Sequence, residues 1–231
     1  MSKKEITTLE QLDAAIEVCE LCPRLVAWRQ EVARTKRRAY LDWTYWGRPV
    51  PGWGDPAARL LMVGLAPGAH GANRTGRPFT GDGSGDFLFA ALHRAGFANQ
   101  PTSTHRDDGL SLTDCYMAGV ARCVPPKNKP NAQELDNCRP FLVHEIGLLP
   151  NVQVVLCLGR LAFDGYLRIL RQGRNDLPRL AFGHGVHYEL DADTPKLLAS
   201  YHPSLQNTNT GRLTAEMMDD VFGKCRALLT D

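Results

Sequence analysis

Four of the seven cysteines have a spacing that suits a metal site. Cys19 and Cys22 form a C-x-x-C pair, Cys123 follows an apolar run, and Cys138 comes after fourteen intervening residues. Four thiolates can hold a tetrahedral Zn²⁺ or a [4Fe–4S] cluster, and spacing alone does not distinguish the two. One close pair with two distant single cysteines, and Pro23 directly after the pair, favours iron–sulfur. Scattered free thiols and a redox C-x-x-C remain alternatives.

The other three cysteines are predicted to pack in the core. Cys115 and Cys157 lie in apolar runs and Cys225 lies in a helical pattern, where a buried thiol acts as a small hydrophobic group. A metal held by the first four would tie the N-terminal helix to residues 124–135. We therefore predict a structural metal rather than an electron carrier.

A glycine-rich segment at residues 64–85 (GLAPGAHGANRTGRPFTGDGSG) is the first candidate site. Its glycines allow backbone amides to approach a ligand, and the helix predicted to follow favours an anion or a carbonyl oxygen at its start. The segment matches neither the P-loop nor the dinucleotide fingerprint. Asp82, its only acid, is interpreted as a helix cap or as a general base. Phe79 is interpreted as a core aromatic residue or as a stacking platform.

Two further polar loops follow apolar runs. In VPPKNKPN (residues 124–131), Lys127 and Lys129 suit a phosphate backbone, and Asn128 offers a donor and an acceptor to a base edge or a water. A solvated turn is the alternative. In SYHPSLQNTNTG (residues 200–211), His202 can donate to a developing oxyanion and Asn207 can orient a ligand. A structural histidine is the alternative there.

The elements that would position these loops alternate along the chain. Apolar runs predict strands over 59–65, 114–121, 152–158 and 196–201, and an exposed strand over 186–190. Periodic segments predict helices over 7–38 (with Thr8 as N-cap and interrupted at Cys22–Pro23), 85–94, 131–149 (with Asn131 as N-cap), 160–170 and 210–229. Residues 40–56 predict an aromatic loop without regular structure. We expect one α/β domain over 1–231, with three α/β/α layers and a mostly parallel sheet. Such sheets carry their sites at the carboxyl ends of strands.

Composition limits the class of protein. The chain has 231 residues, 27 Lys and Arg against 25 Asp and Glu, and 43% hydrophobic residues, which excludes intrinsic disorder. No apolar run is long enough to span a membrane, and the basic N-terminus lacks the apolar region of a secretory signal. Residues 24–48 hold seven basic residues and two acids, a local excess of +5. This excess predicts salt-dependent contact with nucleic acid.

Together these motifs resemble the uracil-DNA glycosylase superfamily, most closely its fifth, iron–sulfur family. GLAPG, RPFTGD, CELCPRL, RCVPPKNKP and the segment around His202 occur in the expected order, between Cys19 and Met218. The resemblance implies that the four cysteines ligate a [4Fe–4S] cluster and that Phe79 stacks on the base. It also implies catalytic roles for Asn128 and His202 and a substrate-binding role for Asn207.

This chain departs from better-known relatives at two positions. Typical uracil glycosylases carry Asp at the position of Ala66, and the fourth family carries Glu at the position of Leu65. With neither acid present, the resemblance assigns activation of water to Asp82. The backbone of Gly64, Ala66 and Gly68 would bind the base.

The implied activity is hydrolysis of the N-glycosidic bond of uracil in DNA after base flipping, without strand cleavage. Hypoxanthine, xanthine and oxidised pyrimidines are expected as further substrates. The expected partner is double-stranded DNA, with single-stranded DNA as a second substrate. We expect a monomer in a prokaryotic cytoplasm, associated with the nucleoid. The alternatives are a metal-stabilised module that binds DNA lesions without catalysis, and a zinc-containing nucleoside hydrolase.

Overall fold

The computed structural model describes residues 6–174 and 176–229, and six of its segments form one sheet. The strands are β1 (Trp53–Gly54), β2 (Leu60–Gly64), β3 (Cys115–Gly119), β4 (Val154–Leu158), β5 (His187–Tyr188) and β6 (Lys196–Ser200). Their order is β1-β3-β2-β4-β6-β5; the four central strands are parallel, and the short edge strands β1 and β5 are antiparallel. The predicted mostly parallel sheet is confirmed.

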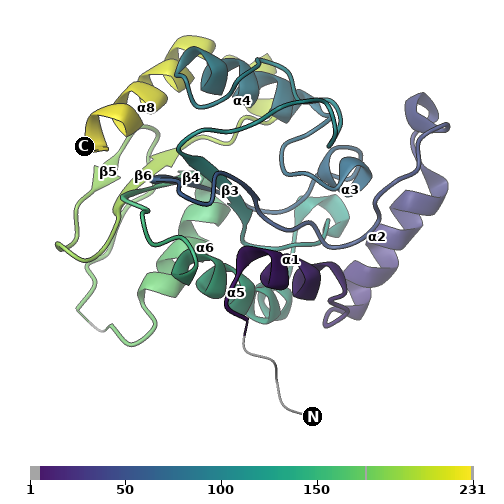
Figure 1. Cartoon of the computed structure of the whole chain (residues 1–231), viewed down its shortest axis with the longest axis horizontal. Helices are drawn as coiled ribbons and strands as arrows, with labels where there is room; N and C mark the ends of the chain where they lie inside the picture. Colours follow the sequence, from purple (N-terminus) through teal and green to yellow (C-terminus); the bar gives the residue numbers. More distant parts are fainter. Residues whose placement is uncertain (1–5, 175, 230–231) are drawn as a thin grey trace.

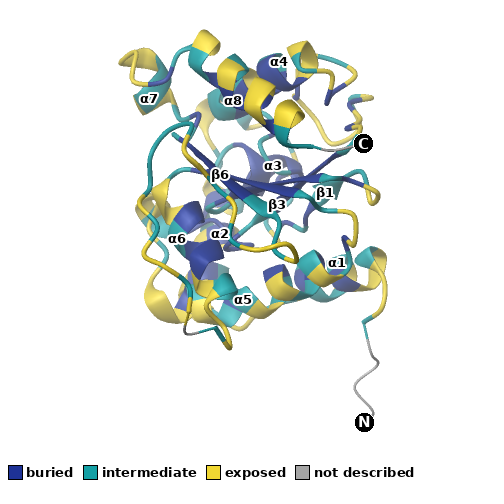
Figure 2. Cartoon of the chain, turned by 90° about the vertical axis from the view of Figure 1, so that its left-hand side faces the viewer, coloured by how far each residue is buried: buried dark blue, intermediate teal, exposed yellow. Residues whose placement is uncertain are grey.

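Helices cover both faces of this sheet (Figure 1). The α-helices are α1 (Leu9–Glu17), α2 (Pro23–Thr35), α3 (Ala72–Thr75), α4 (Gly83–Arg94), α5 (Ala132–Gly147), α6 (Arg160–Leu170), α7 (Leu205–Asn209) and α8 (Ala215–Leu228). Two 3₁₀ turns, η1 (Arg38–Tyr40) and η2 (Pro126–Asn128), complete the set for the described residues. Figure 2 shows the buried sheet between a layer with α4 and α8 and a layer with α1, α5 and α6.

The alternation of side chains along β2 explains the three layers. Leu60 and Met62 belong to the core shared with α4 and α8, whereas Leu61 and Val63 belong to the core shared with α5 and α6. All four side chains are fully buried, because a strand covered on both faces places successive residues in opposite cores.

Several predicted helix boundaries are confirmed. Thr8 caps α1, with its hydroxyl accepting from the backbone N–H of Gln11, and α2 begins at Pro23 as the break at Cys22–Pro23 predicts. Asn131 caps α5 in a reciprocal capping box with Glu134. Among the described residues, no helix is both long and apolar enough to cross a membrane.

Two predictions of local structure are wrong. The helix predicted over 210–229 begins only at Ala215, because Gly211 adopts a left-handed φ of 70° and Thr214 caps the start of α8; the short helix α7 before it was not predicted. The segment 40–56 is not wholly irregular, since η1 reaches Tyr40 and β1 pairs with β3. Tertiary pairing at a sheet edge forms β1 although Gly and Pro flank it.

Candidate active site

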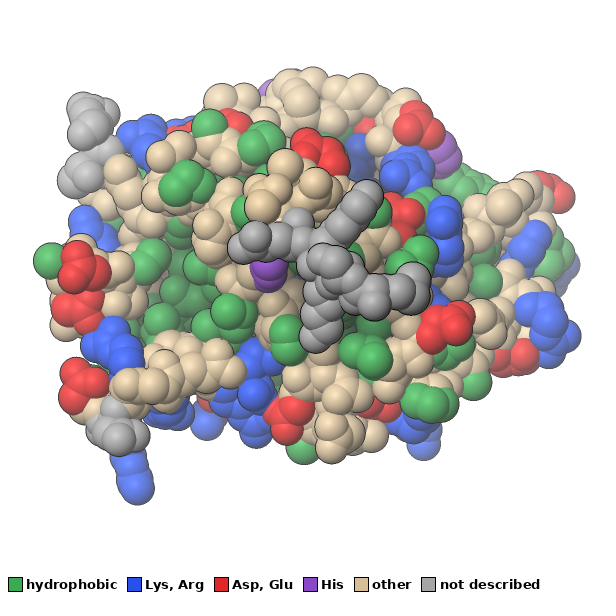
Figure 3. Space-filling view, turned by 60° about the horizontal axis from the view of Figure 1, so that its bottom comes forward, with side chains coloured by type: hydrophobic (Ala, Val, Ile, Leu, Met, Phe, Trp, Pro, Cys, Tyr) green, Lys and Arg blue, Asp and Glu red, His purple; other side chains and the backbone are tan. Residues whose placement is uncertain are grey.

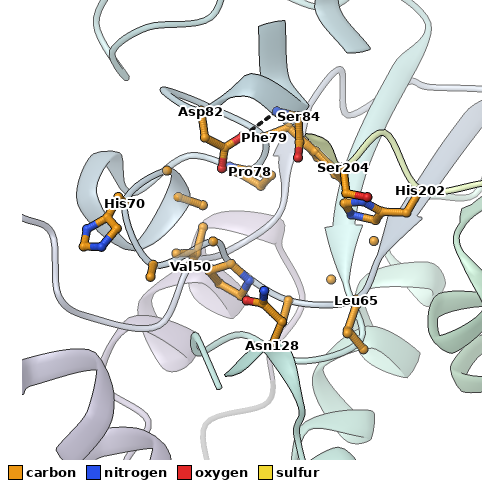
Figure 4. Close-up of a pocket in the computed structure, with 18 of the residues that line it drawn as sticks. Val50, Leu65, His70, Pro78, Phe79, Asp82, Ser84, Asn128, His202 and Ser204 are labelled. Atoms are coloured by element: carbon orange, nitrogen blue, oxygen red, sulfur yellow. Dashed lines mark hydrogen bonds between the residues drawn. The ribbon is translucent and has the colours of Figure 1, made fainter. Parts of the chain in front are cut away.

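A cavity of about 630 Å³ lies at the carboxyl ends of the parallel strands (Figure 4). This volume is typical of small-ligand sites. Its wall comes from residues 64–84 after β2, from the segments after β3 and β6, and from Val50 and Pro51. The structure brings seven predicted site residues to this wall: Gly64, Ala66, Gly68, Phe79, Asp82, Asn128 and His202.

The two carboxylate oxygens of Asp82 have different surroundings. Oδ1 accepts from the backbone N–H groups of Ser84 and Gly85, each at 3.1 Å, so the side chain caps α4 (Figure 4). Among the described residues, no group donates a hydrogen bond to Oδ2. Burial raises the pKa of the carboxyl, and the hydrogen bonds from Gly85 and Ser84 oppose that rise. The residue is therefore a helix cap that also presents an oxygen to the cavity.

Phe79 and His202 place two rings beside each other in the cavity. Their centroids are 5.9 Å apart and their planes differ by 34°. Phe79 adopts an unfavourable left-handed φ of 48°, and its ring lies against the backbone of Gly64, where a β-carbon would come within 3.0 Å of Cζ. The segment therefore accepts backbone strain to hold this ring at the cavity wall.

His202 is neutral at physiological pH. Burial lowers the pKa of its imidazole to about 4. Within residues 6–174 and 176–229, neither ring nitrogen has a hydrogen-bond partner, and Figure 4 shows the ring at the cavity wall. A neutral imidazole retains one N–H group, which is free to donate to a ligand oxygen.

Asn207 does not line the cavity. Its side-chain amide donates to the carbonyl of His202 at 2.8 Å, and its own carbonyl accepts from the backbone N–H of Leu213 at 3.1 Å. These bonds fix the backbone on which the His202 ring is carried. The predicted contact between Asn207 and a ligand stays a prediction, whereas its contact with His202 indicates a positioning role.

Asn128 lies at the exposed rim of the cavity. Lys127 and Asn128 both have left-handed φ angles, 54° and 55°, within η2, so the loop turns sharply where the amide reaches the cavity. Lys127 and Lys129 are exposed and form no ion pair with any residue that the structure describes. The two lysines are thus available to an anionic partner.

Sequence reasoning missed two side chains of this site. His70 lines the cavity with Nδ1 3.0 Å from the hydroxyl of Tyr45, and burial, with Arg37 and Arg74 nearby, lowers its pKa. Leu205 is 55% exposed and lines the same cavity. Only their places in the loops of Asp82 and His202 could have indicated them.

The basic segment 24–48 is less positive in the fold than in the sequence. Four of its seven basic side chains form ion pairs: Arg24 with Glu134, Arg29 with Glu20, Arg34 with Glu31, and Arg48 with Glu17. Of these acids only Glu31 lies in the segment, so counting the other three lowers its local charge from +5 to +2. On the face shown in Figure 3, basic and acidic side chains are mixed rather than separated.

The four predicted ligand cysteines lie near the contact of the start of α2 with α5 and the segment between β3 and α5. All four are free thiols; Cys123 and Cys138 are buried, and Cys19 and Cys22 are partly buried. Asn137 donates to Sγ of Cys22 at 3.4 Å across this contact. Yet no group of three or more His, Cys, Asp or Glu side chains in the described part of the chain is arranged to hold a metal ion.

The same contact has a second link, which needs no metal. The guanidinium of Arg24 donates to both carboxylate oxygens of Glu134, at 2.7 and 2.6 Å, and to the carbonyl of Lys129. Glu134 also takes part in the capping box of α5. A bidentate ion pair therefore connects α2 to residues 129–134, whereas the predicted connection through a metal stays a prediction.

The sequence model of the Uracil DNA glycosylase superfamily matches residues 51–226 of the chain. The chain belongs to this superfamily. The matched region contains all the predicted residues of the cavity, together with Cys123 and Cys138, and it excludes Cys19 and Cys22. Most of the cavity wall therefore lies within the region that the superfamily model matches.

Named relatives within the superfamily are similar over nearly the whole chain. A type-5 uracil-DNA glycosylase of Thermus thermophilus is 52% identical over 92% of this chain and 94% of the relative. One of Mycobacterium bovis is 51% identical over 94% of this chain and 81% of the relative, and one of Pyrobaculum aerophilum is 46% identical over 90% and 88%. The crystal structure of Pedobacter heparinus SMUG2 aligns with 74% of this chain and 76% of its own chain, at 14% sequence identity and a TM-score of 0.46.

Proposed function

We propose that this chain is a monofunctional DNA glycosylase that hydrolyses the N-glycosidic bond of uracil in DNA and leaves an abasic site. One observation carries the proposal: a single cavity holds the free oxygen of Asp82, the neutral ring of His202 and the ring of Phe79. The names of the relatives, type-5 uracil-DNA glycosylase, support uracil as the substrate.

The substrate would enter as a nucleotide flipped out of the duplex, because a stacked base cannot reach an enclosed cavity. Unstacking costs a few kcal/mol and is easiest for a mismatched base, so uracil opposite guanine is favoured. Leu205, exposed at the cavity, is suited to fill the gap left in the stack. Single-stranded DNA needs no such replacement and is a second substrate.

Hydrolysis of this bond passes through a positively charged sugar and an anionic base, as in other glycoside hydrolyses. Asp82 is placed to orient water through Oδ2 and to stabilise the positive sugar. His202 donates to a carbonyl oxygen of the departing base, a contribution of about 3 kcal/mol. The backbone N–H groups of Ala66 and Gly68 have no partner among the described residues and supply further donors.

Two consequences follow from the composition of the cavity wall. No lysine is among the described residues that line it, so the proposed mechanism uses no Schiff base and leaves the strand uncut. Leu65 and Ala66 present no acid, which leaves space for larger or differently substituted bases. Hypoxanthine, xanthine and oxidised pyrimidines are therefore further substrates of this proposal.

We also propose that Cys19, Cys22, Cys123 and Cys138 bind a structural [4Fe–4S] cluster, which joins α2 to α5 when it is bound. Burial raises the pKa of the Cys123 thiol to about 12, and the neighbouring thiols of Cys138, Cys19 and Cys22 add to that rise, so the four sulfurs lie close together. The spacing of one close pair and two distant single cysteines favours a cluster over zinc.

The surroundings of these sulfurs fit an anionic group. Arg29 is 3% exposed, it lowers the pKa of the Cys123 thiol, and its Nε and Nη1 are buried without a partner among the described residues. The backbone N–H of Arg122 donates to Sγ of Cys138 at 3.3 Å. A cluster with four thiolate ligands would satisfy the buried guanidinium.

The partner of this proposal is DNA, bound by one copy of the chain. Its relatives come from bacteria and an archaeon, so the enzyme would act on the nucleoid in a prokaryotic cytoplasm. The exposed Lys127 and Lys129 beside Asn128 are suited to the phosphate backbone.

The test is excision from a labelled duplex with one uracil opposite guanine. A product that is cut only after alkali treatment is expected, because a monofunctional enzyme leaves an intact abasic strand. Intact DNA after alkali would contradict catalysis and favour a lesion-binding module. Cleavage without alkali would contradict the monofunctional mechanism.

A further inference from the structure

Arg74 is a buried cation that lies between the aromatic segment (residues 40–46) and the loop that carries Asp82. Its side chain is 3% exposed, and it forms no ion pair with any residue in the described ranges. Burying a cation without a carboxylate partner is costly, so the residue needs another explanation.

The guanidinium of Arg74 makes cation–π contacts with two rings of the aromatic segment. Its Cζ lies 3.9 Å from the ring centroid of Tyr40 and 3.9 Å from that of Trp43. The backbone N–H of Trp46 also donates to the carbonyl of Arg74 at 2.9 Å. Cation–π contacts at a desolvated site stabilise such a cation and fix its plane.

The edges of the same guanidinium bind both ends of the loop before Asp82. Nε donates to the carbonyl of His70 and Nη2 donates to the carbonyl of Gly81, each at 2.7 Å. Gly81 directly precedes Asp82 and has a left-handed φ of 80°, and a β-carbon there would lie 2.4 Å from Nη2. These two hydrogen bonds from Arg74 therefore fix the backbone directly before Asp82.

We propose that Arg74 is a positioning residue that holds the Asp82 carboxylate in the cavity in its ionised form, and that the aromatic segment serves to hold Arg74. The proposal rests on the proposed role of Asp82. It also gives a role to Tyr40 and Trp43 of the aromatic segment, to which the proposed glycosylase mechanism assigns none.

The charges around Asp82 agree with this proposal. Burial raises its pKa, as does Asp86 on α4, whereas the hydrogen bonds from Gly85 and Ser84 and the charge of Arg74 on α3 lower it. Losing Arg74 should therefore raise the pKa further. Since the carboxylate must be ionised to act, the acid limb of the rate profile should move to higher pH.

Arg77 offers a matched control on the same loop. It is equally buried at 2% exposed, but its guanidinium pairs with Asp108 at 2.8 Å and donates to the hydroxyls of Thr80 and Ser103, not to the carbonyls of His70 and Gly81 that Arg74 binds. Arg77→Met should lower thermal stability and leave the acid limb in place.

The experiment compares Arg74→Met, Arg74→Lys and Arg77→Met by single-turnover excision across pH, and titrates the Asp82 carboxyl by ¹³C NMR. Arg74→Met should lower the rate at high pH by about tenfold or more and move both the acid limb and the Asp82 titration to higher pH. Arg74→Lys should restore the limb while the rate stays below wild type, because an ammonium cannot bridge both carbonyls.

An Asp82 titration unchanged in Arg74→Met would overturn the proposal. If Arg74→Met does not fold, Trp43→Leu is used instead, because it keeps the cation and removes one of its ring contacts. The Asp82 titration should then move to higher pH by a smaller amount, and an unchanged titration would contradict the proposal. Should the wild type fail to excise uracil, the proposed function fails, yet the NMR titration still decides the effect of Arg74 on Asp82.

Discussion

The free oxygen of Asp82 lies directly against Gly71: a β-carbon on Gly71 would lie 2.0 Å from Oδ2. One on Gly68 would lie 2.8 Å from the same atom. These two glycines therefore make room for the carboxylate, in addition to exposing backbone to a ligand.

Gly71→Ala should displace the Asp82 carboxylate and lower the single-turnover rate of uracil excision about 100-fold, because a misplacement of about 1 Å at a catalytic group has that effect. Gly223→Ala is the control, since Gly223 lies within α8 with no atom within 4 Å of an added β-carbon. The control should keep the wild-type rate and gain up to ~1 kcal/mol of stability. A fully active Gly71→Ala would contradict this packing.

His202 should make the protein less stable in acid. Its pKa is about 4 in the fold and about 6.5 when unfolded, so the unfolded chain binds more protons between these values. The stability that its neutral form contributes is present above pH 6.5 and is lost as the pH falls toward 4. Urea unfolding at a series of pH values should show a smaller acid loss for His202→Gln than for wild type, and equal losses would contradict a buried neutral ring.

Leu205→Ala should slow excision from duplex DNA about tenfold and leave the rate on single-stranded DNA unchanged. The reason is that only the duplex has a stacking gap for the leucine to fill. Single-turnover rates on the two substrates, measured with one enzyme preparation, check this directly. An equal loss on both would indicate that Leu205 shapes the cavity instead.

Cys138→Ser should lose most of the iron, the visible absorbance and part of the thermal stability. Wild type should contain about four irons per chain. Cys157→Ser is the control, because Cys157 is fully buried in β4 among apolar residues and should affect only stability. Zinc in place of iron in the wild type would overturn the cluster proposal.

Much of the fold could be predicted because hydrophobic periodicity and capping residues are local signals. The apolar runs at β2, β4 and β6 and the caps Thr8 and Asn131 needed no knowledge of distant contacts. The later start of α8, after Gly211, was missed because a glycine near the end of a periodic segment is ambiguous without its φ angle. Strand β1 was missed because two residues gain strand structure only by pairing with β3.

The site was predictable where residues lie in loops after parallel strands, because the sheet brings those loops together. Asp82, Asn128 and His202 share a cavity for this reason. The contacts of Asn207 with the backbone of His202 and of Arg74 with Tyr40 and Trp43 depend on tertiary packing. No spacing in the sequence indicates them.

The most direct test is the single-turnover rate of uracil excision by Asp82→Asn, which keeps an oxygen to cap α4 and removes the charge. The mechanism predicts a rate at least about 100-fold below wild type with DNA binding unchanged, as expected for loss of a group that acts on water and on the charged sugar. A rate near that of wild type would contradict the central role of this carboxylate.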